Sequence, residues 1–108
     1  MASIGDRVLA EWPQEQGQWW YPGVVVSDAG QAQDVQFDDG GRATLSSSQM
    51  RPLSIGAGQR VFCRWKGGEQ YYGGRVSSAV GGCILVDYDD GDKESTSVSM
   101  VRINSADL

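Results

Sequence analysis

Residues 35–40 read Val-Gln-Phe-Asp-Asp-Gly, and residues 86–91 read Val-Asp-Tyr-Asp-Asp-Gly. In both stretches an apolar and a polar side chain alternate up to an aromatic residue, which is the period-two pattern of a half-buried strand. The Asp-Gly pair that follows favours a two-residue hairpin turn, because both residues tolerate the positive φ angles of such a turn. Each copy therefore predicts a strand that ends on the aromatic residue, followed by a tight turn.

The offset of 51 residues between these stretches also relates other parts of the chain. It aligns Trp20–Val25 with Tyr71–Val76 and Met50-Arg51 with Val101-Arg102. An offset of 53 aligns Gly5–Trp12 with Gly58–Trp65, and the two-residue difference falls in the loop that follows Trp12. Four blocks in the same order indicate an internal repeat. We therefore predict two small domains, residues 1–53 and 54–108.

Each copy has the pattern of five short strands. In the second copy the strands are expected at 59–66, 70–77, 83–88, 92–96 and 100–103, and the first copy repeats this pattern. In the first copy, the last elements expected are a strand near 42–45, one helical turn at 46–49 and a closing strand at 50–53. About 50 residues are too few for a two-layer sandwich, so the strands should curl into a small barrel that hides their edges. The predicted fold class is all-β, with two tandem five-stranded SH3-like barrels.

The charge balance indicates a cationic partner. The chain carries 14 acidic and 9 basic residues, a net charge of −5. The first copy has seven acids and three bases (−4), and the second has seven acids and six bases (−1). Nucleic-acid binders usually show a basic surplus, because phosphate contacts dominate their affinity. We therefore expect a basic protein partner rather than nucleic acid.

The residues that carry most enzymatic or metal chemistry are absent or badly spaced. The sequence has no histidine, which is the commonest general base. Its two cysteines, Cys63 and Cys83, have no paired motif and read as small apolar residues in a reducing compartment. The aspartates between 87 and 92 lack the ligand spacing of a calcium loop. We expect no enzyme activity, no cofactor, no metal and, without an apolar run of about 20 residues, no membrane span.

Aromatic residues occupy equivalent positions in the two copies. One ends the first strand, one begins the second and one ends the third; the pairs are Trp12/Trp65, Tyr21/Tyr72 and Phe37/Tyr88. On a five-stranded barrel these three points converge at one end, where the rings would form a concave wall that attracts a weakly hydrated cation. The competing interpretation is a core position, which is strongest for Phe37 and Tyr88. A tryptophan at a strand end is too large to bury fully in so small a unit.

At this point the sequence resembles the Tudor family, of the tandem kind found in readers of methylated chromatin and similar to plant Agenet pairs. The resemblance covers nearly the whole chain and rests on the order and duplication of its blocks: Gly5 to Trp12, Tyr21-Pro22-Gly23, Val35 to Gly40 and Met50 to Leu53, with their counterparts at Gly58 to Trp65, Tyr72 to Gly74, Val86 to Gly91 and Val101-Arg102.

The resemblance implies a cage for methylated lysine or methylated arginine in each copy. By position, the first cage would consist of Trp12, Tyr21, Phe37 and the acidic Asp39, and the second of Trp65, Tyr72, Tyr88 and Asp90. Many family members carry a further aromatic residue two positions after the aspartate. This chain has Gly41 and Asp92 there, so each cage is expected to lack one wall.

The leading hypothesis is a non-enzymatic reader of methylated lysine or arginine in a basic protein tail, histone-like if the chain is eukaryotic. Two alternatives remain: a nucleic-acid binder that uses a local patch of Arg60, Arg64, Lys66 and Arg75, and a structural protein-interaction adaptor. We expect an intracellular monomer, nuclear in a eukaryote and cytoplasmic in a bacterium.

Overall fold

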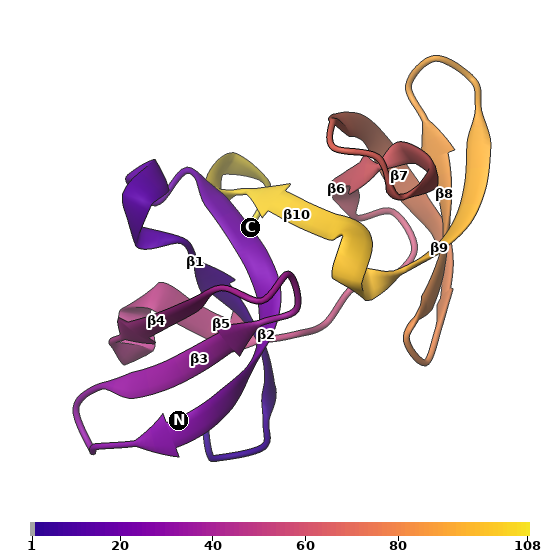
Figure 1. Cartoon of the computed structure of the whole chain (residues 1–108). Coiled ribbons are helices and arrows are strands. Elements are labelled where there is room, and N and C mark those ends of the chain that lie inside the picture. The colour runs from indigo at the N-terminus through magenta and orange to yellow at the C-terminus, as the bar shows by residue number, and fades with distance from the viewer. Residues whose placement is uncertain (1) are drawn as a thin grey trace. The chain divides into compact units, whose positions relative to one another are not determined.

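The computed structural model describes residues 2–108, so Met1, the start of the first predicted domain, lies outside the described residues. The chain divides into two compact units, one ending at Ser54 and the other spanning Ile55–Leu108 (Figure 1). Both consist of β-strands and one-turn 3-10 helices, so the all-β class is confirmed. The part of the chain that the structure describes holds no helix with the length and apolar character needed to cross a membrane.

Residues 2–54 form one antiparallel sheet of five strands. These are β1 (Arg7–Glu11), β2 (Trp19–Asp28), β3 (Gln33–Phe37), β4 (Arg42–Leu45) and β5 (Met50–Pro52). They pair in the order β5-β1-β2-β3-β4. One-turn helices lie after β1, as η1 (Pro13–Glu15), and before β5, as η2 (Ser47–Gln49). The strand expected near 42–45 and the turn before the closing strand are thus present.

Residues 55–108 repeat this arrangement. Their strands are β6 (Arg60–Arg64), β7 (Tyr71–Val80), β8 (Cys83–Tyr88), β9 (Lys93–Ser97) and β10 (Val101–Asn104). The pairing order β10-β6-β7-β8-β9 matches that of the first unit strand for strand. Short helical turns η3 (Trp65–Gly67), η4 (Val98–Met100) and η5 (Ser105–Asp107) follow β6, β9 and β10. The internal repeat in sequence is therefore a repeat in strand order.

The sheet of the first unit curls around a core. In the first unit, Leu45 of β4 and Met50 of β5 come from opposite ends of the strand order, yet both pack in the cluster that contains Val8 and Val35. A bulge in β2 between Val25 and Ser27, and the equivalent bulge in β7, increase the local twist. Among residues 2–54 no ladder joins β4 to β5, where η2 intervenes, so the sheet is open there and the two five-stranded barrels stay a prediction.

A glycine at the same place in each unit permits the close approach of two strands. A Cβ atom on Gly74 of β7 would lie 2.7 Å from the carbonyl oxygen of Asp87 and 2.9 Å from Cγ1 of Val86. Gly23 of β2 is equally crowded, at 2.8 Å from Val35. Because Gly23 pairs with Phe37 and Gly74 with Tyr88, these glycines bring the aromatic end of the third strand close to the second.

The turn after each third strand differs from the predicted two-residue hairpin. Gly40 has φ +99° and Gly91 φ +95°, but among the described residues Asp39 and Asp90 do not have positive φ. The Gly40 N–H donates to the Phe37 carbonyl at 3.0 Å, and the Phe37 N–H donates to the Gly41 carbonyl at 2.7 Å. The prediction was wrong because only the glycine adopts the left-handed conformation, which gives a longer loop with the glycine at its bulge position.

An ion pair fastens this turn to the first strand in both units. Arg7 donates two hydrogen bonds to the Asp38 carboxylate, at 2.5 and 2.6 Å, and Arg60 makes the equivalent bond to Asp89 at 2.5 Å. The hydrogen bond from Arg60 holds the pKa of Asp89 below its usual range. Ion pairs that are open to solvent contribute little to stability. The main effect of this pair is to fix the position of the turn that carries Asp39 or Asp90.

Candidate functional site

The aromatic residues predicted for the first cage gather around one hollow of about 370 Å³. We call it the first hollow; it is lined by Trp12, Gln14, Glu15, Tyr21, Phe37 and Asp39. The ring centroids of Trp12 and Phe37 lie 5.3 Å apart at an interplanar angle of 82°, and those of Tyr21 and Phe37 lie 6.4 Å apart at 89°. The Trp12 and Tyr21 rings thus stand nearly perpendicular to the central Phe37 ring, as edge-to-face pairs do.

Strand register explains how these rings meet. Tyr21 of β2 lies opposite Ala10 of β1, and Phe37 at the end of β3 lies opposite Gly23 of β2. Trp12 directly follows β1, and its backbone N–H donates to the Trp19 carbonyl at 3.2 Å. This bond holds Trp12 beside the first residue of β2. Three adjacent strands therefore present their ends at the same edge of the curled sheet.

Phe37 is both a core residue and the floor of the first hollow. Its side chain is only 2% exposed and packs in the core cluster, yet it also lines the hollow. Tyr88 holds the same double position in the second unit at 6% exposure. The alternatives of core and cage left open by the sequence are thus not exclusive. Trp12 and Tyr21 are only partly buried and form the upper walls.

Gly41 stands where many Tudor family members carry a further aromatic residue, and the side chain of Trp12 already covers it. A Cβ atom on Gly41 would lie 3.2 Å from both Cη2 and Cζ3 of Trp12, and 3.3 Å from Oδ1 of Asp39. The indole of Trp12 therefore lies directly against the backbone of Gly41. A side chain at position 41 would therefore require the Trp12 ring to shift.

The turn η1 adds two polar residues that the sequence analysis did not predict. Gln14 and Glu15 follow Trp12 and line the first hollow. Oxygen Oε1 of Glu15 is buried and has no hydrogen-bond partner among residues 2–108. Only the proximity of Glu15 to Trp12 in the sequence could have signalled this, because a three-residue turn does not fix the direction of a side chain.

The second hollow, of about 230 Å³, brings together all four residues predicted for the second cage. It is lined by Trp65, Tyr72, Tyr88, Asp90 and Asp92. The centroids of Trp65 and Tyr88 lie 5.4 Å apart at 85°, nearly the geometry of Trp12 and Phe37. Tyr72 is 48% exposed and its hydroxyl donates to Gln70, so this wall is more open to solvent than the others. Asp92 stands at the position of the missing fourth wall.

The floor of the second hollow is polar where that of the first is apolar. The Tyr88 hydroxyl donates to Oε1 of Glu94 at 2.6 Å, and the Lys66 backbone N–H donates to Oε2 at 2.8 Å. Burial, with the bond to Glu94, raises the pKa of Tyr88 above its usual range. Burial also raises the pKa of the adjacent Cys63 thiol to about 12. The equivalent positions in the first unit are Phe37, Ala43 and Ala10, which need no polar partner.

Both predicted acidic residues lie at the rims of the hollows. Oxygen Oδ1 of Asp39 accepts a hydrogen bond from the Gly41 N–H at 2.9 Å, and Oδ1 of Asp90 accepts one from the Asp92 N–H at 3.0 Å. These bonds fix the carboxylates in their turns. Both side chains are exposed, so their charges act through solvent.

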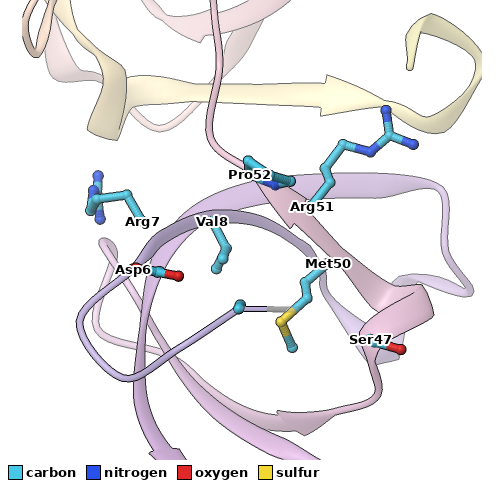
Figure 2. Close-up of a pocket in the computed structure, with 8 residues that line it drawn as sticks. Asp6, Arg7, Val8, Ser47, Met50, Arg51 and Pro52 are labelled. Atoms are coloured by element: carbon cyan, nitrogen blue, oxygen red, sulfur yellow. The ribbon is translucent and has the colours of Figure 1, made fainter.

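A third hollow, of about 330 Å³, lies elsewhere in the first unit and has no aromatic lining among its described residues. Figure 2 shows Val8 and Met50 pointing into the interior of the curled sheet, while the guanidinium groups of Arg7 and Arg51 point away from it. Asp38 already binds Arg7. Across residues 2–108 no group of three or more potential metal ligands lies together. The aromatic hollows are therefore the candidate sites.

Comparison with known proteins gives one family match and two structures of similar fold. A family model described as "Domain of unknown function (DUF4537)" matches residues 1–57. No curated protein matches the sequence. The solved structure "Crystal structure of Crb2 tandem tudor domains" is similar with a TM-score of 0.71 at 16% identity, covering 99% of this chain and 84% of that chain. "Crystal structure of Arabidopsis thaliana AGDP1 AGD34" matches with a TM-score of 0.48 at 16% identity, covering 94% and 81%. The predicted Tudor-like fold is confirmed.

Proposed function

We propose that this chain, which belongs to the family described as a domain of unknown function (DUF4537), is a non-enzymatic module that binds methylated lysine or methylated arginine in a basic protein tail. The observation that carries the proposal is the recurrence, in both units, of three rings around a hollow with a carboxylate at its rim. In this proposal the two curled sheets act as a tandem pair of SH3-like Tudor barrels.

The physical basis is the attraction between a cation and the face of an aromatic ring. Each ring contributes roughly 0.5–2 kcal/mol to binding a desolvated or partly desolvated cation. Methylation makes a lysine or arginine head bulkier and less strongly hydrated, so the head loses less solvation on entering an aromatic hollow. Three rings without a fourth give an expected Kd of about ten micromolar to millimolar.

The charge distribution supports a basic tail as the partner. The first unit has a net charge of −4 through Leu53, against −1 for the rest of the chain. A negative field attracts a peptide that is rich in lysine and arginine, and it repels nucleic acid. We therefore propose the first hollow as the principal binding site, with Trp12, Tyr21 and Phe37 as its aromatic walls.

Titration with peptides tests this function. Lysine- and arginine-rich peptides, unmethylated or methylated at one position, are added to ¹⁵N-labelled protein while the indole N–H signals of Trp12 and Trp65 are followed. Methylated peptides are expected to shift the Trp12 signal at micromolar to millimolar concentration, and unmethylated peptides to shift it far less.

Two variants make the test specific. Trp12→Ala is expected to abolish binding with the fold retained, because it removes the largest wall, and Trp65→Ala is expected to have a smaller effect. Wild-type affinity in both variants would show that the cages are wrongly assigned. If no methylated peptide shifts either indole signal, the reader function is wrong and an adaptor function takes its place.

A further inference from the structure

We propose that Glu94 is a positioning residue of the second hollow, and that its carboxylate, acting through the Tyr88 ring, makes this hollow prefer a cation to an uncharged group of the same shape. The inference rests on the proposed function, since it presupposes that a methylated cation enters the hollow. Glu94 is not among the described residues that line the hollow, and it contacts the floor from behind. It adds a residue outside the predicted cage.

The first observation is that one carboxylate binds both the floor and a wall of the site. Oε1 of Glu94 accepts a hydrogen bond from the Tyr88 hydroxyl at 2.6 Å, and Oε2 accepts one from the Lys66 backbone N–H at 2.8 Å. Lys66 directly follows Trp65 and has φ +52°, a left-handed conformation that is uncommon outside glycine. Its bond to Glu94 therefore fixes the turn that carries the Trp65 wall, while the other oxygen fixes the Tyr88 floor.

The second observation is that strand register places this carboxylate under the floor. Glu94 of β9 pairs with Val86 of β8, and Tyr88 lies two residues further along β8 on the same face as Val86. Diagonal side chains on one face of an antiparallel pair are within reach of each other when they are long. Val86 is 1% exposed and Glu94 is partly buried. Water therefore screens the charge of Glu94 less than it screens the exposed carboxylates of Asp90 and Asp92.

The third observation is the chemistry of the bond between Tyr88 and Glu94. Burial, with this bond, raises the pKa of Tyr88 above its usual range, so the proton stays on Tyr88 and the hydroxyl donates a charge-assisted bond. Donation to an anion leaves more electron density on the phenol oxygen and on the ring. A cation binds the negative face of an aromatic ring, so a more electron-rich ring attracts it more strongly. The charge of Glu94 also acts on the neighbouring Cys63, where it adds to burial in raising the pKa of the thiol to about 12.

The first unit lacks this pair of residues. Phe37 stands in place of Tyr88, and Ala43 stands in place of Glu94, although the backbone register is the same in both units. The simpler role for Glu94 is to supply the partner that a buried tyrosine hydroxyl needs. In that case Glu94 would affect only the shape of the hollow. Under the proposal it also affects how strongly the hollow distinguishes a cation from an uncharged group.

The test uses two probes of the same shape: the Nα-acetyl amide of trimethyllysine, and its uncharged carbon analogue, in which a tert-butyl group replaces the trimethylammonium group. Neither head carries an N–H, so hydrogen bonds from the head to an acid play no part. Each probe is titrated into the whole chain while the Trp65 indole N–H signal reports the second hollow and the Trp12 signal the first. The quantity compared is the Kd of the uncharged probe divided by the Kd of the cation. A change in the shape of the hollow moves both Kd values together, so this ratio responds to electrostatics.

The decisive variant is Glu94→Gln, which removes the charge but keeps the size of the side chain and an acceptor for the Tyr88 hydroxyl. It is expected to lower the ratio at Trp65 about threefold, within the range of a single cation–π contact, and to leave the ratio at Trp12 unchanged. In the Tyr88→Phe background the same substitution should lower the ratio by less, because the ring no longer donates to Glu94. An equal fall in the wild-type and Tyr88→Phe backgrounds overturns the role of the ring.

The matched control is Glu69→Gln, which removes one charge from the exposed loop that follows Trp65. It should leave the ratio at Trp65 unchanged. The same ratio in Glu94→Gln as in the wild type, or an equal fall in Glu69→Gln, overturns the role of Glu94, while binding of the cation itself still supports the proposed function. A cation that shifts no Trp65 signal also overturns the inference; the proposed function fails with it only if methylated peptides shift neither indole.

Discussion

Replacing Asp92 by tyrosine should complete the second cage. Asp92 lines the second hollow beside Trp65, Tyr72 and Tyr88, at the position where the chain departs from the Tudor pattern. Its side chain is exposed. The described bonds of this residue to the turn are made by its backbone, whose N–H donates to Asp90 and whose carbonyl accepts from the Tyr88 N–H. A tyrosine there keeps the turn and adds a ring to the hollow.

The expected gain follows from two opposing effects. A fourth ring contributes roughly 0.5–2 kcal/mol, equivalent to about two- to thirtyfold in Kd. Loss of the carboxylate removes an attraction of about 1 kcal/mol at 4 Å in water, less with salt. Asp92→Asn removes the charge without adding a ring. The ratio of the Asp92→Asn Kd to the Asp92→Tyr Kd should therefore be about two to thirty.

The assay is the titration of Nα-acetyl dimethyllysine amide, followed at the Trp65 indole N–H. Gly41→Tyr provides the contrast in the first unit. A Cβ atom there would meet the Trp12 ring at 3.2 Å, so the new side chain should bring no gain and should displace an existing wall. Equal affinities for Asp92→Tyr and Asp92→Asn would show that the second hollow does not bind cations through its rings.

Three further predictions concern the fold that supports the hollows. In the native protein, iodoacetamide at neutral pH should label the exposed Cys83 and spare Cys63, whose pKa is raised by burial to about 12. Mass spectrometry measures the labelling, and equal modification of both cysteines would contradict the packing of the second unit. Hydrogen bonds from a threonine and a serine hydroxyl hold the pKa of Asp34 below its usual 3.8, so the contribution of Asp34 to stability is complete above that pH and is lost as the pH falls through the lower, folded-state pKa. Acid titration of Asp34→Asn should therefore show a smaller loss of stability than the wild type, and an unchanged dependence of stability on pH would count against these bonds. Urea unfolding should show Gly74→Ala destabilised by about 1–3 kcal/mol or more, because its Cβ atom would lie 2.7 Å from a backbone oxygen. Gly82→Ala, which has no neighbouring atom within 4 Å of its Cβ, should change the free energy of unfolding by no more than about 0.5 kcal/mol. Similar effects of the two substitutions would contradict the close strand approach at Gly74.

The repeat and its strands could be predicted from sequence because their signals are local. Alternation around Val35 and Phe37 and around Val86 and Tyr88 reports which residues share a face, and an aromatic residue at a strand end stays at that end in any five-stranded arrangement. The pairing of the first four strands of each unit in sequence order then follows from short connections between neighbours, whereas the pairing of the fifth strand with the first does not. For that reason the aromatic residues that line each hollow could be predicted as a group, although nothing in the sequence showed that Phe37 is at once core and floor.

Only the tertiary structure decided what lies beside those rings. The Trp12 indole covers Gly41, a contact between residues 29 positions apart that no local pattern encodes. Likewise, Glu15 reads as an exposed acid in a polar loop until the turn η1 places it in the first hollow. Periodicity specifies faces of regular strands, because each residue adds a fixed rotation. The direction of a side chain in an irregular turn depends instead on which distant segments pack against it, and these become neighbours only when the sheet has curled.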